Sequence, residues 1–474
     1  MLNRLFHEVV TVKHVSVQLE CDSTNAPATV IITLFDRLFC IANQPRMNRE
    51  TFRLVLLVSC AHAMVHIYEL TFSGIEQQIE LELIEERIPE TALKEHSSIL
   101  EAASVRQEER TPQQRQLLDH YVPDHKSMIA RVGWLGTAWT LPFGLGAVIA
   151  GWLADRVGSK RILIAYLIGC AVLSTSVGFS KSYSSLLLTM ILMGAFASFY
   201  HPAGLSLISR VTDRKNRGIA LGWHGIIGNI GITIAPMLAT FVSLQLSSWR
   251  SVYMLLTIPG ILLALILFRK LPSDQAHSAL LQNGNRQESN NRWLCFSMYC
   301  FIAWLLGITY RAFTTFLPRY LESPEYVGVV LAVGIIGQYF SGHLASRFRL
   351  EYLLGIIVVA HIPLLLWMSS AELFISRLSA SLFFSFTLFM SQPVGNSLVA
   401  MYISERQRSM GYGIAFLVSF GAGSIGAFLA GKIQEYYTLS HVYSFLSIGL
   451  VPAMICAAGL MLISRHTTSS VDDN

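Results

Sequence analysis

The chain has 474 residues, of which 53% are hydrophobic and 14% are charged, and its mean hydropathy is +0.48. Soluble domains carry about 25% charged residues, so this composition excludes a soluble globular protein and a disordered chain. A net charge of +5 excludes a nucleic-acid binder built on basic patches, and seven cysteines exclude a disulfide scaffold. The composition predicts an integral membrane protein with many spans.

Twelve segments are long and apolar enough to cross a bilayer, which takes about 20 residues in a helix. Their uniformly apolar character favours helices over barrel strands. With both termini in the cytoplasm, nineteen Lys and Arg residues lie in inner loops and ten in outer loops, as the positive-inside rule requires. The predicted spans are 54–75, 132–154, 162–179, 184–209, 219–244, 252–268, 293–317, 326–346, 352–370, 373–401, 409–431 and 442–464.

Residues 1–46 precede the first span, and their apolar stretch is too short and interrupted to cross a membrane. This stretch also lacks the features of a signal peptide. We predict a dispensable N-terminal extension, with Met47 as an alternative start, or else a plain cytoplasmic tail. The remaining predicted parts are a bundle over 47–268, a cytoplasmic linker over 269–292, a second bundle over 293–465 and a tail over 466–474.

A long acidic segment, 76–126, follows the first predicted span. It contains twelve acidic and six basic residues, and helix-forming residues dominate it. We expect this segment to be an insertion in the first outer loop that forms helical extensions outside the membrane. A solvated cap and a partner-docking segment are both compatible with this composition.

Two motifs occur once in each predicted bundle. The sequence Gly-Trp-Leu-Ala-Asp-Arg at 151–156 recurs as Gly-His-Leu-Ala-Ser-Arg at 342–347, and His-Pro-Ala-Gly at 201–204 recurs as Gln-Pro-Val-Gly at 392–395. Both recurrences have the same offset of 191 residues. The shared offset predicts that helices 1–6 and 7–12 are two copies of one unit, related by an axis along the membrane normal.

The loop between spans two and three resembles the signature loop of the major facilitator superfamily. Its glycines allow a sharp turn, its acid can face the positive N-terminus of a neighbouring helix, and its cations anchor the cytoplasmic side. The resemblance implies an all-α membrane fold of twelve helices in two pseudo-symmetric bundles, with this loop as a latch between them. Ser346 replaces Asp155 in the second copy, so a weaker latch is expected there. The loop residues are Gly151, Asp155, Arg156, Gly158, Lys160 and Arg161.

Two further stretches are similar to the fosmidomycin-resistance-like branch of drug-efflux facilitators. They are Phe199-Tyr200-His201-Pro202 in helix 4 and the glycine-rich helix 5 with Gly222, Gly225, Gly228 and Gly231. This narrower resemblance implies proton-coupled export by an antiporter in the inner, or plasma, membrane.

Helix 1 carries His62, His66 and Glu69 at i, i+4 and i+7, so the three side chains share one face. Ionisable residues inside a span are costly and mark functional sites. We predict a proton-coupling or substrate site on this face; a static set of interhelical hydrogen bonds is the alternative.

Helix 7 carries Tyr310-Arg311, which matches Tyr68-Glu69 of helix 1 once the acidic segment is counted as an insertion. Arginine keeps its charge in lipid surroundings and needs a counter-ion. We expect Glu69 and Arg311 to face each other across the cavity, where a proton or an anionic substrate competes for the pair. A static ion pair is the alternative.

His201 in helix 4 and Gln392 in helix 10 each precede a proline, which frees backbone carbonyls that can line a cavity. We expect His201 and His224 to form an inner histidine layer, separate from the outer layer of Glu69 and Arg311. The family resemblance implies that helices 1, 4, 7 and 10 line the cavity.

Together these features predict a secondary active transporter that moves a small molecule by alternating access, with proton-coupled efflux. A proton-coupled importer of a small organic anion and a non-transporting receptor are alternatives. A membrane metalloenzyme is disfavoured because His62-Ala-Met-Val-His66 lacks the glutamate of the zinc motif, and no nucleotide-binding loop is present. We expect no enzymatic activity, no cofactor or metal and no nucleic-acid partner. Protons and a small molecule are the expected ligands of a monomer in the lipid bilayer.

Overall fold

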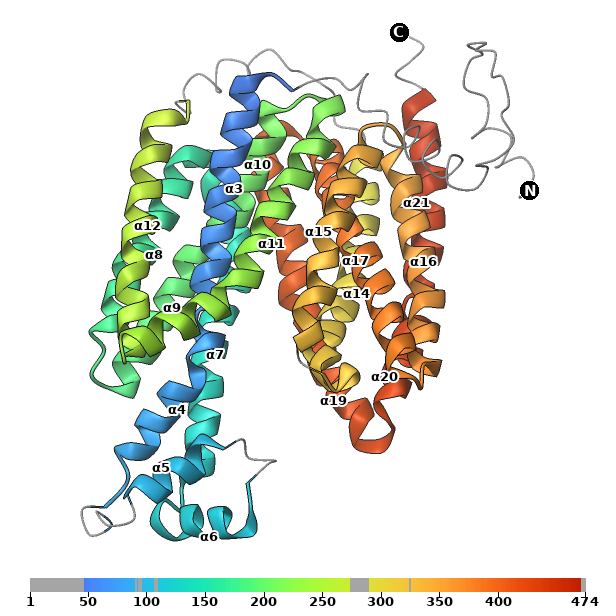
Figure 1. Ribbon diagram of the computed structural model, residues 1–474. Helices are drawn as coiled ribbons and strands as arrows, with labels where there is room; N and C mark the ends of the chain where they lie inside the picture. Colours follow the sequence, from blue (N-terminus) through green and yellow to red (C-terminus); the bar gives the residue numbers. More distant parts are fainter. Residues whose placement is uncertain are drawn as a thin grey trace, which may run out of the picture. The chain divides into compact units, whose positions relative to one another are not determined.

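The computed structural model describes residues 47–89, 92, 96–105, 110–272, 290–323 and 325–469, and the described residues are almost entirely helical (Figure 1). The predicted N-terminal extension, most of the linker and the end of the tail lie outside this part. In the first half the helices are α3 (Arg49–Leu70), α4 (Glu76–Glu85), α5 (His96–Ser104), α6 (Pro112–Tyr121), α7 (His125–Val157), α8 (Ser159–Gly178), α9 (Tyr183–Ala197), α10 (Tyr200–Val211), α11 (Arg214–Gln245) and α12 (Trp249–Lys270). In the second half they are α14 (Asn290–Leu321), α15 (Glu325–Ala345), α16 (Leu350–Ser370), α17 (Phe374–Tyr402), α18 (Arg408–Phe416), α19 (Ile425–Tyr436), α20 (Leu439–Gly449) and α21 (Val451–Ser469).

Among the described residues, 12 helices are long and apolar enough to cross a membrane, and each predicted span falls on one of them. The largest shift is in the first span, which ends at Leu70 instead of residue 75. Asn48 caps its start by accepting a hydrogen bond from the amide of Thr51 at 2.7 Å, and a 3-10 turn, Phe72–Gly74, follows its end. The predicted all-helical, twelve-span fold is therefore confirmed.

Two of the twelve spans are interrupted near candidate functional residues. The fourth span breaks between α9 and α10 at Ser198 and Phe199. The eleventh contains a π-helix, Leu417–Gly421, and a 3-10 turn, Ala422–Ser424, between α18 and α19. Pro202 has no amide to bond the carbonyl of Ser198, which accounts for the first interruption. Neither interruption was predicted from the sequence.

The acidic segment is helical, as expected, and it is attached to the first half. Arg250 donates a hydrogen bond through Nη2 to Glu82 Oε1 at 2.6 Å, and the Trp249 indole donates to Glu82 Oε2 at 2.8 Å. Gln78 donates to the Ser243 hydroxyl at 2.7 Å. These contacts join α4 to the start of α12 and the end of α11.

The predicted repeat is visible in how the two halves pack together. Helix α7 contacts α18, and α15 contacts α11, through small residues that let backbones approach closely. Adding 191 to the first-half member of one contact pair and subtracting 191 from its second-half member gives the other pair. The paired contacts are Gly151 on Ser409 with Gly342 on Gly218, and Gly413 on Ala147 with Gly222 on Gln338.

The expected match of Tyr68-Glu69 with Tyr310-Arg311 is wrong by about one helical turn. The equivalent contacts of the first helix in each half are His62 on Gly228 and Gly307 on Ser419. Because Ser419 is the repeat counterpart of Gly228, Gly307 is the counterpart of His62. Arg311 therefore corresponds to His66, since each lies four residues further along its helix. Two shared residue types are a weaker guide to register than helix packing.

Candidate functional site

Four histidines from three helices form one cluster. The rings of His62 and His224 stack with centroids 4.0 Å apart, and His201 lies 5.1 Å from His62 and 5.7 Å from His66. The expectation of a separate inner histidine layer is therefore wrong. Gly228 of α11 packs directly on the His62 ring, and this close approach brings α3 and α11 together.

A hydrogen-bond chain runs through this cluster along α3. Glu69 Oε2 lies 2.9 Å from His66 Nδ1, and His66 Nε2 lies 3.1 Å from His62 Nε2. His62 Nδ1 lies 2.9 Å from the backbone carbonyl of His224. We call these three residues, Glu69, His66 and His62, the proton chain.

The partners of the proton chain determine where its hydrogens lie. A carbonyl only accepts, so His62 Nδ1 donates to His224, and a neutral His62 then accepts through Nε2. His66 must therefore donate through Nε2 while its Nδ1 bonds the Glu69 carboxyl. Either the His66 imidazole is doubly protonated or the Glu69 carboxyl is protonated. Both arrangements place one transferable proton on the Glu69–His66 pair.

Tyr200 completes the cluster, although the sequence analysis did not single it out. Its hydroxyl donates to the carbonyl of Val58 at 2.8 Å, so it accepts from His224 Nε2 at 3.0 Å. Its ring stacks on His62 with the planes 11° apart. The signal was present in Phe-Tyr-His-Pro, where a buried tyrosine in helix 4 precedes His201.

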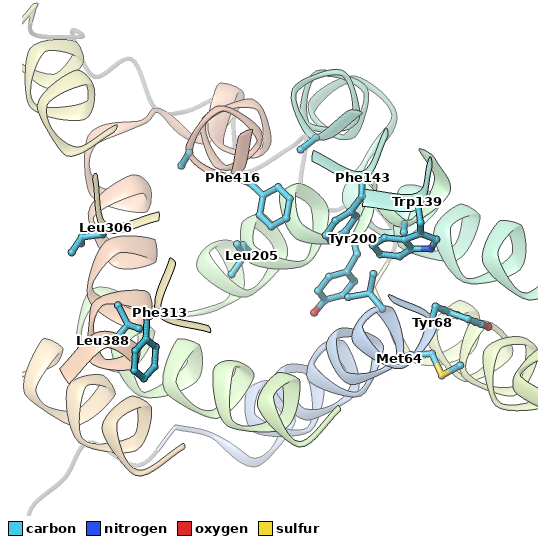
Figure 2. Packing of buried hydrophobic residues seen from close by; sticks show 14 of the residues in the cluster. Met64, Tyr68, Trp139, Phe143, Tyr200, Leu205, Leu306, Phe313, Leu388 and Phe416 are labelled. Atoms are coloured by element: carbon cyan, nitrogen blue, oxygen red, sulfur yellow. The ribbon is translucent and has the colours of Figure 1, made fainter. Parts of the chain in front are cut away.

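The second half faces this cluster with aromatic rings. His201 stacks on Phe416 at 4.3 Å between centroids, and Phe416 stacks on Phe420 at 4.8 Å. Phe143 of α7 and Phe416 of α18 point toward each other, with ring centroids 5.1 Å apart (Figure 2). Tyr310 of α14 packs edge-on against Phe420 at 5.7 Å. The histidine cluster therefore meets the second half across an aromatic contact.

Glu69 and Arg311 do not form the expected ion pair. Glu69 is paired with His66, and Arg311 is exposed and has no ion pair within the described ranges. Tyr68, in contrast, is buried with its hydroxyl on the Leu256 carbonyl of α12 at 3.2 Å, so it does not join the site.

An amide chain connects the halves beside the cluster. Asn229 of α11 donates to Gln338 Oε1 of α15 at 3.2 Å, and Gln338 donates to Gln392 Oε1 of α17 at 2.7 Å. Gln392 thus lies at the interface, whereas its repeat counterpart His201 lies in the histidine cluster. Asn229 and Gln338 are further residues that the sequence analysis missed, because single amides in apolar helices carry no motif.

The predicted latch loop makes the contacts that its chemistry suggests. Asp155 accepts hydrogen bonds from the backbone amides of Ser409 at 3.0 Å and Met410 at 2.9 Å, at the start of α18. Arg210 donates to the same carboxylate at 2.8 Å. In the second copy, the Ser346 hydroxyl donates to the carbonyl of His343 in its own helical turn, and within the described ranges it has no hydrogen bond to the other half.

The other loop residues have separate surroundings. Gly158 adopts a φ of 102°, which favours glycine, and so turns the chain between α7 and α8. Arg156 lies over the Trp152 ring at 4.0 Å, and Lys160 donates to the carbonyl of Leu271 at 2.6 Å. Arg161 approaches the carbonyl of Val157 at 3.4 Å.

Three histidines, His62, His66 and His201, could hold a metal ion only after a shift of side chains. Their nitrogens lie within 4.8 Å of one another, whereas two nitrogens on one zinc at about 2.1 Å each lie about 3.3 Å apart. The 3.1 Å separation of His62 and His66 is that of a hydrogen bond that needs a proton.

The comparisons agree with this architecture. A family model described as the Major Facilitator Superfamily matches residues 123–427. The chain belongs to the major facilitator superfamily. Several of its relatives are named as transporters, and the described residues include 12 helices long and apolar enough to cross a membrane.

Individual relatives of this superfamily member are distant, and their names refer to different compounds. It is 33% identical over 143 residues to a puromycin resistance protein of Streptomyces alboniger, an alignment that covers 30% of this chain and 28% of that protein. It is 24% identical over 321 residues to a 3-(3-hydroxy-phenyl)propionate transporter of Escherichia coli, covering 64% of this chain and 77% of the relative. The chain spans only 25% to 33% of the first curated relatives it matches.

Solved structures share the fold at low sequence identity. A human organic anion transporter has a TM-score of 0.62 at 15% identity, covering 87% of this chain and 100% of that chain. The proton:xylose symporter XylE has a TM-score of 0.64 at 11% identity, covering 85% of this chain and 94% of that chain.

Proposed function

We propose that this major facilitator transporter exports a small molecule by alternating access in exchange for protons. The observation that carries the proposal is the proton chain, which needs one transferable proton to keep its hydrogen bonds. We place the protein in the plasma membrane as a monomer, with both termini and the latch loop on the cytoplasmic side.

The surroundings of the chain support a coupling role. The titratable or polar groups that face the proton chain are His201 and Tyr200 of α10, His224 of α11 and Tyr310 of α14. Glu69 is the acid of the cluster, so loss of the proton leaves a net negative charge among neutral rings. In a poorly solvated site this charge is costly, and a change of conformation that solvates it lowers the cost.

The contacts of the latch loop support the change of conformation in this proposal. In the described part of the chain, the hydrogen bonds between the halves come from Asp155, Arg210 and Asn229 of the first half, and Asp155 and Arg210 lie at the proposed cytoplasmic side. We propose that this side is closed in the protonated state, with the proton loaded from outside. Release of the proton inward then accompanies breaking of the Asp155 contacts.

Export is supported by the similarity to drug-efflux facilitators and by the relative named for puromycin resistance. Proton-coupled import would use the same proton chain, and other relatives are named for organic acids. The direction of transport is therefore decided by the sign of the proton gradient that drives accumulation of the probe.

The test uses the full chain in liposomes with a proton gradient of either sign and two labelled probes, puromycin and 3-(3-hydroxyphenyl)propionate. We expect accumulation of a probe only when protons flow against it, with Glu69→Gln abolishing that accumulation. Tyr68→Phe is the matched control on the same helix. Probe accumulation that is the same under both proton gradients, or that is unchanged in Glu69→Gln, contradicts proton coupling. Probe accumulation in the same direction as proton flow would indicate import instead of export.

A further inference from the structure

The second half holds a charge that the proton chain does not use. Arg311 lies in the span Arg292–Leu321, is exposed, and forms no ion pair in the described part of the chain. Its guanidinium stays ionised, and Glu69 is already paired with His66. A cation inside a span is stabilised when it binds an anion in a water-accessible site. The Arg311 guanidinium is therefore available to bind an anion.

A stack of nearly parallel rings contacts Tyr310, the residue before Arg311. The rings are His201, Phe416 and Phe420, and we call them the aromatic shelf. The planes of adjacent rings differ by 20° and 23°. Phe420 is 42% exposed, so the shelf ends in an open ring face. Tyr310, the residue before Arg311, packs its edge against Phe420. Tyr310 thus packs helix α14 against the shelf one residue before Arg311.

The backbone that carries the shelf is irregular only in this copy of the repeat. Leu417–Gly421 is π-helical and is followed by a 3-10 turn. The corresponding stretch of the first half lies inside α11, which runs as an unbroken α-helix from Arg214 to Gln245. Single π-turns inside α-helices occur frequently at functional sites. The interruption includes Phe420 and follows Phe416 directly, so it sets how both rings are presented.

We propose that the substrate is an organic monoanion with an aromatic ring, whose carboxylate binds Arg311 and whose ring stacks on Phe420. A guanidinium binds a carboxylate through two parallel hydrogen bonds, which selects an acid over a neutral amide. An aromatic face selects a planar ring over a saturated one, because stacked π-systems gain more than area burial alone. The inference rests on the proposed function, since both use the same site between the halves.

The experiment measures binding by calorimetry to the purified full-length protein with three probes of similar shape. They are 3-phenylpropionate, its neutral amide, and the saturated 3-cyclohexylpropionate. We expect the amide to bind about tenfold more weakly than the acid and the cyclohexyl acid about fivefold more weakly. Equal binding of acid and amide overturns the proposal, as does a lack of binding by all three probes.

Two variants separate the groups. Arg311→Gln removes the preference for acid over amide and keeps the preference for the phenyl ring, whereas Phe420→Leu does the reverse. The retained preference shows that each variant is folded. Arg319→Gln and Phe428→Leu, which change residues of α14 and α19 outside the proposed site, keep both preferences. A preference for the acid that persists in Arg311→Gln overturns the assignment.

This test fails independently of proton coupling. Proton-driven flux of puromycin without acid binding contradicts the monoanion and leaves the proton chain supported. Binding of the acid without any gradient-driven flux contradicts the proposed function and leaves the binding site supported.

Discussion

The two halves of this protein share one scaffold and carry different chemistry. Glycine contacts such as Gly151 on Ser409 and Gly342 on Gly218 recur in both halves at the same repeat positions. At the centre, however, the first half presents four histidines, Tyr200 and Glu69, and the second presents Phe416, Phe420, Tyr310 and Arg311.

This difference shows which constraints a duplicated unit keeps. Helix packing is required equally in both copies, so small residues persist where backbones touch. The site needs each function only once, so its residues are free to differ. In the proposed account, the first half holds the proton and the second half holds the ligand.

The largest effect is expected from removing the acid of the first half. Glu69→Gln can still bond His66 by donating its amide N–H to Nδ1, but it holds no transferable proton. Gradient-driven accumulation in liposomes should therefore fall by about 100-fold, near the upper end of coupling between linked sites. Exchange of labelled for unlabelled probe without a gradient should stay within about threefold of the wild type. Parallel loss of both activities would indicate a structural role instead.

The latch offers a comparison between equivalent positions. Asp155→Asn loses the ionised acceptor of two amides and Arg210, which is worth about 2 kcal/mol, so closure of the latch should weaken by more than about tenfold. Cysteine labelling at an introduced site near Ser409 measures this opening. Ser346→Asp should change labelling little, because the facing amide of Gly218 lies inside α11 and is already bonded there. A strong effect of Ser346→Asp would contradict this reading of the asymmetry.

The acidic segment is a further difference between the halves, because the second half has no equivalent segment. Its Glu82 carboxylate bonds Arg250 and Trp249, and the hydrogen bond from Arg250 lowers the pKa of Glu82. A lowered pKa stabilises the folded segment above the ordinary glutamate range, and this stabilisation is lost as the pH falls through the lowered value. Glu82→Gln should cost about 1 kcal/mol at neutral pH, after allowance for solvent screening.

Limited proteolysis of residues 76–121 at pH 7 and pH 3 measures the effect. Glu82→Gln should be cleaved faster than the wild type at pH 7 and equally fast at pH 3. Glu76→Gln on the same helix is the control, because burial and the nearby Glu80 raise the pKa of Glu76, so its neutralisation removes no stabilisation. Equal cleavage of all three proteins at pH 7 would argue against the Glu82 anchor.

The smallest effect is expected at Tyr68. Its hydroxyl bonds a backbone carbonyl away from the site, so Tyr68→Phe should cost about 1 kcal/mol of stability and change flux by less than about twofold. A thermal shift together with a flux assay checks both parts. A change in the proton dependence of Tyr68→Phe would return this residue to the site.

Much of the fold was predictable from the sequence because spans and repeats depend on composition and spacing. The twelve spans follow from apolar length, and the offset of 191 residues is repeated in the helix contacts. The face of His62, His66 and Glu69 was predictable because helical periodicity places them together.

The pairing between helices was not predictable. Glu69 was expected on Arg311 and is bonded to His66. Arg311 corresponds in the repeat to His66, a register that follows from helix contacts such as Gly307 on Ser419 that no short motif encodes. The joining of His201 and His224 to His62 depends on the close approach of α11 at Gly228. The π-helix at Leu417–Gly421 likewise leaves no mark in an apolar sequence.

The central claim is that one proton on Glu69 and His66 holds the halves in the conformation closed by Asp155. Distances between spin labels at Lys181 and Glu372, exposed residues after α8 and α16, test it directly in the full-length protein at pH 5 and pH 9. The account predicts a shift to shorter distances at pH 9 in the wild type and no shift in Glu69→Gln. An identical distribution at both pH values in the wild type, or the same shift in Glu69→Gln, would contradict it.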